Sequence, residues 1–314
     1  MTDILITAPT PDFLRKPLEE TYICHDYHAS NDKPGLLKTI GKTIKGLVQG
    51  GGTVSTPELL DQLPNLEVIS VFGVGYDGVA VDYCKKRGIK VGHTPDVLTD
   101  DVADVALALT LMSARNFHRA DPFVRSGDWE KKSFPLATSL NGKTVGILGL
   151  GRIGKAIAQR LEACGMKVGY HSRSAQAVRY TYYSSLLEMA RAVQFLVIAT
   201  PGGPATKNMI NAEVLAALGA KGRLINISRG SVVDEPALIN ALRDGTLGGA
   251  GLDVFADEPR VSAELRAMEN VVLLPHVGSA THETRKGMGD LVLANLEAHF
   301  AGKPLVKLIP ELQG

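Results

Sequence analysis

The sequence predicts an α/β protein built from two doubly wound parallel sheets. Short apolar runs alternate with helical patterns along the chain, which is typical of parallel sheets covered by helices on both faces. A glycine motif lies near the middle, where an apolar run at 144–148 leads into Gly149, Gly151 and Gly154. The length of 314 residues is sufficient for two domains, each with its own core.

Five short apolar runs in the first third of the chain are the candidate strands of one sheet. These runs are 4–6, 22–24, 46–48, 68–71 and 89–91. Between the last two runs, residues 77–86 have a helical pattern, and Gly88 is placed to end that helix because glycine tolerates a left-handed backbone.

The middle section contains the candidate strands of a second sheet. They are 144–148, 167–170, 195–199, 224–227, 251–255 and 271–274. Helix signals lie between them: an apolar stripe runs along 153–164 and stops at Gly165, while Asn211 and Asp234 are placed as N-caps. Six strands with intervening helices match a complete doubly wound dinucleotide-binding fold.

Three further segments connect or complete these sheets. Residues 100–114 predict a long, mostly apolar helix that joins the two sheets, and residues 283–300 predict a C-terminal helix that returns to the first domain. The segment 117–141 is polar, lacks a clean period and contains the only tryptophan, Trp129. A segment of this length without regular structure usually has a specific task, such as contacting a partner subunit.

Composition excludes several classes of protein. A net charge of +1 provides no broad field for nucleic acid or for an anionic membrane. Cys24, Cys84 and Cys164 are scattered and odd in number, which indicates reduced thiols in a cytoplasmic protein. Neither a signal peptide nor a membrane span is expected, because the N-terminus carries an early acid and the longest apolar stretch is short. His25 and His28 have no further ligands around them, so no metal site is expected.

The glycine motif predicts a bound dinucleotide. Gly149 permits a tight turn, Gly151 lets the backbone approach a pyrophosphate, and Gly154 lets the following helix lie close to the strand. The phosphates would then bind to N–H groups at the positive end of that helix.

The end of the second strand of this fold indicates which dinucleotide is bound. NAD-binding sheets carry an acid there, whereas this chain has His171, Ser172, Arg173 and Ser174. The guanidinium of Arg173 would attract a 2′-phosphate, and the two serine hydroxyls would add hydrogen bonds. We therefore expect NADP as the cofactor, with NAD as the alternative.

Three polar residues follow the ends of late strands, where open α/β sheets bind their ligands: Arg229, Glu258 and His276. A histidine can give a proton to a carbonyl oxygen while a hydride arrives on its carbon, and a carboxylate partner fixes the ring and favours its protonated form. An arginine can bind a carboxylate with two hydrogen bonds and polarise the neighbouring carbonyl. The small residues at 73–75 can expose backbone donors to an anion.

Several of these motifs resemble those of the D-2-hydroxyacid dehydrogenase family, and the likeness is greatest to its NADPH-preferring glyoxylate/hydroxypyruvate reductases. The matching stretches are GVGYD at 73–77, TDDVAD at 99–104, GLGRIG at 149–154, ISRG at 227–230, GLDVF at 251–255 with Glu258-Pro259, and PHVGSAT at 275–281. Together they extend over nearly the whole chain.

The resemblance implies roles for individual residues. Arg229, Glu258 and His276 would be catalytic, with His276 as the acid/base. The residues that would bind the substrate are Val74 and Gly75 through their backbone N–H groups, Arg229, His276, Ser279 and Trp129. The residues that would bind the dinucleotide are Thr99, Gly149, Leu150, Gly151, Arg152, Ile153, Gly154, Ser172, Arg173, Ser174, Thr200, Pro201, Thr206, Ile227, Ser228 and Asp253, the last near the nicotinamide amide.

The resemblance also implies a domain plan and a partner. Residues 1–98 with 285–314 would form a flavodoxin-like substrate-binding domain, and residues 99–284 would form an NADP-binding Rossmann domain. Family members are usually homodimers joined through the cofactor domains, so the segment 116–142 would be the dimerisation arm. Trp129 would either reach the active site of the partner subunit or only pack at the contact.

We therefore expect NADPH-dependent reduction of a small 2-oxo acid to the D-2-hydroxy acid, with closure of the domains excluding water. The alternatives are an enzyme that reduces 2-ketogluconate or phenylpyruvate and an NAD-dependent member such as a phosphoglycerate or D-lactate dehydrogenase. A formate dehydrogenase is disfavoured, because that branch has glutamine where Glu258 stands. Outside the enzymes, the alternative is a dinucleotide-sensing scaffold like the corepressors built on this fold.

Overall fold

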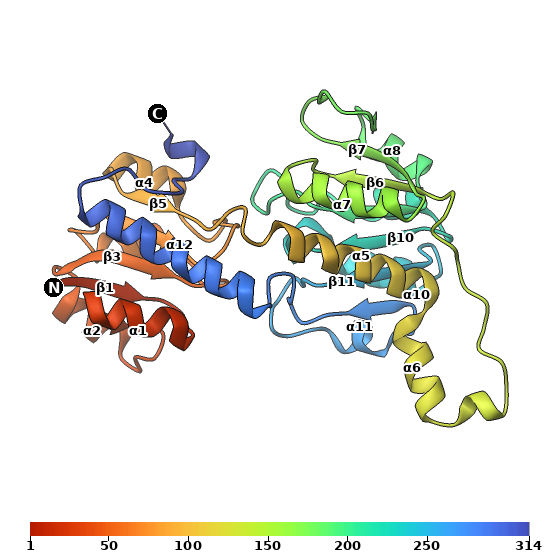
Figure 1. Ribbon diagram of the computed structural model, residues 1–314, viewed down its shortest axis with the longest axis horizontal. Helices are drawn as coiled ribbons and strands as arrows, with labels where there is room; N and C mark the ends of the chain where they lie inside the picture. The colour runs from red at the N-terminus through yellow and green to blue at the C-terminus, as the bar shows by residue number, and fades with distance from the viewer. Residues whose placement is uncertain (314) are drawn as a thin grey trace. The chain divides into compact units, whose positions relative to one another are not determined.

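The computed structural model describes residues 1–313 and contains two compact units. The first unit comprises Met1–Leu98 together with the segment that begins at Thr281, and the second comprises Thr99–Ala280. Each unit contains one sheet, and all strand pairs in both sheets are parallel (Figure 1). The two parallel sheets confirm the predicted fold class.

The sheet of the first unit has five strands in the order β2-β1-β3-β4-β5, which is the flavodoxin-like order. The strands are β1 (Thr2–Ile6), β2 (Tyr22–Asp26), β3 (Ile44–Gln49), β4 (Val68–Val71) and β5 (Lys90–Gly92). Each overlaps one of the five apolar runs. The carboxyl ends of β4 and β5 lead into the loops that carry Val74 and His93.

Helices cover both faces of this sheet. They are α1 (Asp12–Thr21), α2 (Lys33–Ile40), α3 (Pro57–Asp61), α4 (Val81–Arg87) and α12 (His282–Phe300). Because side chains alternate along a strand, Ile4 and Ile6 of β1 pack with α1 and α12, whereas Leu5 packs with α2, α3 and α4. Figure 1 shows α1 and α12 lying side by side.

The helix expected at 77–86 begins four residues later, at Val81. The residues before it are held in a turn instead, since the N–H of Val79 donates to the carbonyl of Tyr76 and the N–H of Ala80 donates to the carbonyl of Ser55. Gly88 ends the helix with a φ of 72°, as predicted.

The second unit has a seven-stranded sheet in the order β12-β11-β10-β9-β6-β7-β8. The strands are β6 (Thr144–Leu148), β7 (Lys167–His171), β8 (Thr181–Tyr182), β9 (Phe195–Ile198), β10 (Arg223–Asn226), β11 (Gly249–Leu252) and β12 (Val271–Leu273). The two-residue β8 at the edge was not predicted. Strand β11 begins two residues earlier than expected, because Gly249 pairs with Arg223 of β10. As a glycine it has no apolar side chain that would mark it as part of a strand in the sequence.

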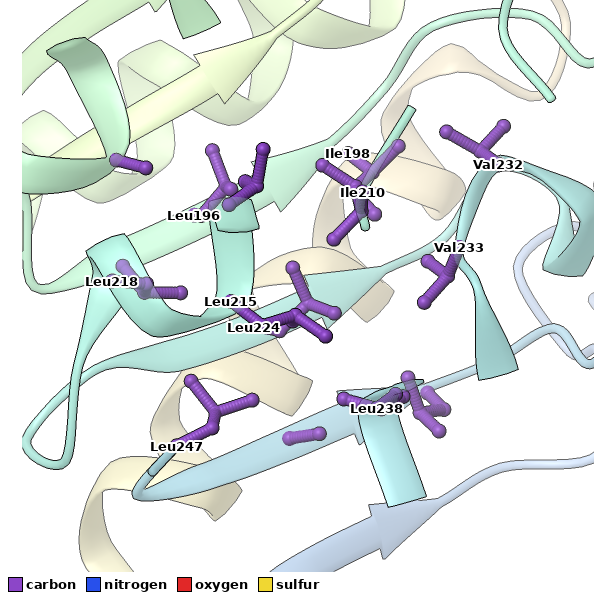
Figure 2. Packing of buried hydrophobic residues seen from close by; sticks show 14 of the residues in the cluster. Leu196, Ile198, Ile210, Leu215, Leu218, Leu224, Val232, Val233, Leu238 and Leu247 are labelled. Carbon is purple, nitrogen blue, oxygen red and sulfur yellow. The ribbon is translucent and has the colours of Figure 1, made fainter. Parts of the chain in front are cut away.

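The helices of the second unit are α5 (Thr99–Arg115), α6 (Phe117–Arg125), α7 (Arg152–Ala163), α8 (Leu186–Ala192), α9 (Ala212–Leu218), α10 (Glu235–Arg243) and α11 (Ala263–Ala267). Asn211 and Asp234 cap α9 and α10 as predicted, each accepting a backbone N–H at 3.1 Å. Figure 2 shows the core beneath them, where Leu196 and Leu224 of the sheet face Leu215 of α9.

The segment 117–141 is more ordered than its sequence predicted. Helix α6 occupies its first nine residues, and a short 3₁₀ turn follows at Asp128–Glu130. A side-chain pair between Arg125 and Asp121, one turn apart, supports the helix although Pro122 lies inside it. None of the residues of α6 is buried, and Trp129 is 66% exposed. Among the helices of residues 1–313, none has the length and apolar composition that a membrane crossing requires.

Candidate active site

The glycine motif lies between β6 and α7. Gly149 has a φ of +94°, and a Cβ atom on it would lie 2.9 Å from the backbone of Thr200. A Cβ atom on Gly154 would lie 2.1 Å from the carbonyl oxygen of Gly149, so only glycine permits this close contact of helix and turn. At Gly151, the N-cap of α7, a Cβ atom would have no neighbour within 4 Å among the described residues. The backbone is therefore open to a ligand where a pyrophosphate is expected.

The loop after β7 lies next to this turn. The side-chain amide of Gln176 donates to the carbonyl of Leu150 at 3.0 Å, which links the loop to the glycine motif. Within the loop, the hydroxyl of Ser172 donates to the carbonyl of Ser174 at 2.7 Å, while Arg173 is exposed. No acidic side chain occurs at residues 171–176, so the charge at this end of the site is suited to a 2′-phosphate.

His276 and Glu258 are brought into direct contact. The Nδ1 atom of His276 lies 2.6 Å from Oε2 of Glu258, and Oε1 of Glu258 accepts the N–H of Phe255 at 3.0 Å. Burial would raise the pKa of Glu258, but the hydrogen bonds from His276 and Phe255 and the nearby charge of Arg229 hold it below its ordinary value. The carboxylate is therefore ionised near neutrality and accepts a hydrogen bond from the Nδ1–H of His276, which leaves Nε2 directed away from Glu258.

Asp253 holds the loop that carries His276. This residue is 1% exposed, and its two carboxylate oxygens accept the N–H groups of Val277 at 2.7 Å and Gly278 at 2.9 Å. His276 itself has a φ of +54°, a left-handed conformation that non-glycine residues seldom adopt. Because both following amides are bound, the turn is fixed in this conformation. Burial raises the pKa of Asp253, although these two amides oppose the shift.

Arg229 follows β10 and begins the 3₁₀ turn Gly230–Val232. Its carbonyl accepts the side-chain amide of Asn226 at 2.9 Å, and its Nη1 atom donates to the carbonyl of Ser228 at 2.9 Å. The next residue, Gly230, lies directly against the backbone of Phe255, the residue that donates to Glu258. Arg229 and Glu258 are thus carried by loops in contact with each other.

The remaining predicted cofactor residues of this unit lie at the carboxyl ends of its strands or near them. The hydroxyl of Ser228 donates to the carbonyl of Thr200, which joins the ends of β10 and β9. The hydroxyl of Thr206 donates to the carbonyl of Pro201 at 2.8 Å and shapes the loop after β9. Ile227 is buried. Other predicted residues in this unit are Thr99 at the start of α5, Arg152 and Ile153 in the first turn of α7, and Ser279 after the His276 loop.

The two predicted substrate residues of the first unit lie in the loop after β4. The carbonyl of Gly73 accepts the N–H of Thr94 at 2.9 Å, and the carbonyl of Val74 lies 3.0 Å from Nδ1 of His93. Within residues 1–313, the N–H groups of Val74 and Gly75 have no protein acceptor. They are available to a ligand.

Sequence reasoning missed the residues that position the predicted ones. Asn226, Gln176 and His93 each hold a backbone carbonyl of a predicted site loop. Asp253 was predicted only as a cofactor residue, but it also fixes the turn of His276. The only signal for Asn226 and Asp253 was their place at the end of a strand.

His276, paired with Glu258, can donate a proton to an oxygen atom of a substrate. The charge of Arg229 helps to lower the pKa of Glu258. The glycine motif and the loop at 172–174 have the backbone donors, the cation and the hydroxyls that a phosphorylated dinucleotide requires. The second unit therefore has the groups that a dinucleotide site and an acid/base pair require, a combination suited to hydride transfer.

Comparison with known proteins agrees with this chemistry. Residues 107–278 match the family model described as D-isomer specific 2-hydroxyacid dehydrogenase, NAD binding domain. The chain is 48% identical over 304 residues to the hydroxyphenylpyruvate reductase of Plectranthus scutellarioides, covering 96% of this chain and 97% of that protein. It is 43% identical over 305 residues to the 2-ketogluconate reductase of Gluconobacter oxydans, covering 97% of both chains.

A solved structure is also similar to this chain over nearly its whole length. It is the NADPH-dependent glyoxylate/hydroxypyruvate reductase of Sinorhizobium meliloti, in complex with NADP and malonate. The TM-score is 0.92 at 42% sequence identity, and the match covers 99% of this chain and 97% of the other.

Proposed function

This chain belongs to the D-2-hydroxyacid dehydrogenase family, as its motifs predicted, and we propose that it reduces a small 2-oxo acid of the glyoxylate or hydroxypyruvate type to the D-2-hydroxy acid with NADPH. It is an NADP-dependent oxidoreductase. The observation that carries the proposal is the 2.6 Å contact between His276 and Glu258, in the same unit as the dinucleotide-binding glycine turn.

His276 is the acid of the proposed reaction. Its Nδ1–H donates to the ionised carboxylate of Glu258, so the proton on Nε2 is the one that can be transferred to the carbonyl oxygen of the substrate. When bound, NADPH supplies the hydride that goes to C2 of the substrate. Glu258 stabilises the positive charge of the imidazolium before the proton is transferred. It accepts the hydrogen bond from Nδ1–H both before and after the transfer.

Three groups bind the substrate carboxylate in this proposal. The guanidinium of Arg229 pairs with it and polarises the neighbouring carbonyl. The N–H groups of Val74 and Gly75, which lack a protein acceptor within residues 1–313, donate to the same carboxylate. Ser279 lies three residues after His276 and would contribute a hydroxyl nearby.

The cofactor contacts follow from the loops at the ends of the strands. The backbone along Gly149–Gly154 would bind the pyrophosphate, and Arg173 with Ser172 and Ser174 would bind the 2′-phosphate. Residues that follow β9, β10 and β11 would also line the dinucleotide, and Asp253 would lie near the nicotinamide amide. These residues include Thr200, Pro201, Thr206, Ile227, Ser228 and Asp253.

We also propose that the protein is a homodimer joined through the arm at 116–142. Four large apolar side chains in this segment are exposed: Phe117, Val124, Trp129 and Leu136. Their burial against a second copy would remove this apolar surface from water. The cytoplasmic location remains a prediction from the scattered cysteines. Light scattering of the purified protein tests the dimer, and a monomer at micromolar concentration would contradict it.

The experiment that tests the function is a panel of 2-oxo acids assayed with NADPH and with NADH. We expect the highest kcat/KM for glyoxylate or hydroxypyruvate with NADPH. Because two relatives are named as reductases of other 2-oxo acids, the panel must also include 2-ketogluconate and hydroxyphenylpyruvate as competing substrates. Tight NADPH binding without turnover of any 2-oxo acid would instead favour a dinucleotide-sensing scaffold.

A further inference from the structure

His93 of the first unit lies beneath the loop that carries Val74 and Gly75. It follows β5, is 8% exposed, and its Nδ1 atom lies 3.0 Å from the carbonyl oxygen of Val74. A carbonyl oxygen can only accept, so the proton of the imidazole is on Nδ1 in this contact. His93 is therefore a donor to the backbone of the proposed carboxylate-binding loop.

A trans peptide directs its C=O and its N–H to opposite sides. The peptide between Val74 and Gly75 is trans, so a hydrogen bond that holds the carbonyl of Val74 on the side of His93 turns the N–H of Gly75 to the other side. The preceding peptide is held in the same way, because the N–H of Thr94 donates to the carbonyl of Gly73 at 2.9 Å. Two neighbouring residues after β5 thus hold two successive carbonyls.

His93 is itself rigidly placed. Its N–H donates to the carbonyl of Lys307 at 3.0 Å, and its carbonyl accepts the side-chain amide of Asn295 at 3.4 Å. The Oδ1 atom of Asn295 accepts the N–H of Lys307 at 2.9 Å, which closes a small network between α12 and the segment after it. The imidazole meets the ring of Tyr76 edge-on, with the ring centroids 5.3 Å apart. These contacts give the Nδ1–H group a single direction.

We propose that His93 is a positioning residue for the substrate carboxylate, which acts by aiming the N–H of Gly75. The inference rests on the proposed function of the loop at 73–75. His93 does not touch the substrate in this account. Its hydrogen bond prevents the Val74–Gly75 peptide from rotating, so that the donor is already oriented when the anion arrives and no ordering cost is incurred on binding.

Two substitutions separate the hydrogen bond from the packing. The amide nitrogen of asparagine is the same number of bonds from Cα as Nδ1 of histidine, so His93→Asn retains a donor to the carbonyl of Val74. His93→Leu retains apolar bulk beside Tyr76 and removes the donor. We expect His93→Leu to raise the KM for glyoxylate about tenfold or more, with the Kd for NADPH and the kcat at saturation changed much less, and His93→Asn to stay within about threefold of wild type.

Binding of oxamate to the NADPH-loaded protein supplies a readout that does not need turnover. We expect the Kd for oxamate to rise with the KM in His93→Leu and to be restored in His93→Asn. Unchanged KM and oxamate affinity in a folded His93→Leu protein would overturn the inference. So would equal losses in both variants, because packing and not the donor would then be responsible.

The outcomes for the two proposals are distinguishable. The proposed function would be refuted if the wild-type protein turned over no 2-oxo acid. The role of His93 would still be supported if the wild-type protein bound oxamate and the Kd for oxamate rose in His93→Leu but not in His93→Asn. Wild-type turnover with no effect of His93→Leu would do the reverse. If His93→Leu does not fold, His93→Gln takes its place, since its amide nitrogen is one bond too far along to reproduce Nδ1.

Discussion

Gly230 lies so close to Phe255 that a Cβ atom on the glycine would be 1.9 Å from the carbonyl carbon of Phe255. This contact brings the turn after Arg229 against the loop whose N–H binds Glu258. The glycine is therefore required by the geometry of the site, since a backbone atom cannot move aside as a flexible side chain can.

Gly230→Ala should separate these two loops. We expect a loss of about 1–3 kcal/mol in the free energy of unfolding and a large fall in kcat, because Arg229 and Glu258 would no longer be correctly spaced. Denaturant unfolding and steady-state kinetics measure the two effects. Gly51→Ala is the matched control, since a Cβ atom at Gly51 has no neighbour within 4 Å among the described residues. Equal behaviour of the two variants would show that the close contact is unimportant.

Asp253→Asn tests the turn that carries His276. Asparagine can accept only one of the two N–H groups of Val277 and Gly278 and presents its own donor to the other. An unsatisfied buried donor costs about 1–3 kcal/mol, and the left-handed conformation of His276 would lose its support. We expect lower stability together with a lower kcat. A variant with reduced NADPH affinity alone would show that Asp253 acts only on the cofactor.

Local features of the fold were predictable from the sequence, because they depend on neighbours along the chain. The caps Asn211 and Asp234, the end of α4 at Gly88 and most strands are of this kind. The two-residue strand β8 was not, since two residues cannot establish a period. Helix α6 was not predicted either, because none of its residues is buried and Pro122 interrupts the helical pattern of its sequence.

The site was predictable to the extent that chemistry requires particular residue types after particular strands. Strand order places His276 and Glu258 at one end of the sheet, and their motifs were recognisable. His93 and Gln176 could not be found in this way. His93 binds the carbonyl of a residue 19 positions away in the chain, and Gln176 binds one 26 positions away. No sequence pattern specifies such contacts.

His276→Asn tests the acid directly and suits the backbone. Asparagine tolerates the left-handed conformation at this position better than alanine does, so the loop should stay folded. We expect kcat to fall by about 10²–10⁴-fold, with the Kd for NADPH nearly unchanged, because the proton donor is lost and the cofactor site is not. Nucleotide fluorescence titration measures the affinity. Retention of most of the activity would exclude His276 as the acid.

Glu258→Gln should affect both the reaction and the pH dependence of stability. The amide oxygen of glutamine can accept a hydrogen bond from either His276 or the N–H of Phe255. The neutral amide cannot stabilise the positive charge of the imidazolium, so we expect a lower kcat. The pKa of Glu258 is lower in the folded protein than its ordinary value of 4.5. Its stabilising contribution is therefore complete above pH 4.5 and is lost as the pH falls through the lower, folded-state pKa.

Unfolding experiments on wild type and Glu258→Gln between pH 3 and pH 7 measure this contribution. The difference in the free energy of unfolding should be largest near neutrality and should shrink as the solution becomes acidic. A difference that grows toward low pH would mean that the carboxyl is favoured in its protonated form, contrary to the ion pair with His276.

Arg173→Ala tests the choice of cofactor. Arg173 is exposed in the loop after β7, and this loop is linked to the glycine motif through Gln176. A charge-assisted hydrogen bond contributes about 1.5–3 kcal/mol, so removing the guanidinium should raise the KM for NADPH by about 10–100-fold. The KM for NADH should be nearly unchanged, because NADH lacks the 2′-phosphate. Arg191→Ala, at an exposed position in the last turn of α8, controls for the loss of one positive charge. Equal weakening of NADPH and NADH binding would show that Arg173 does not contact the 2′-phosphate. The hydroxyls of Ser172 and Ser174 would then be the remaining groups in this loop that could distinguish the two cofactors.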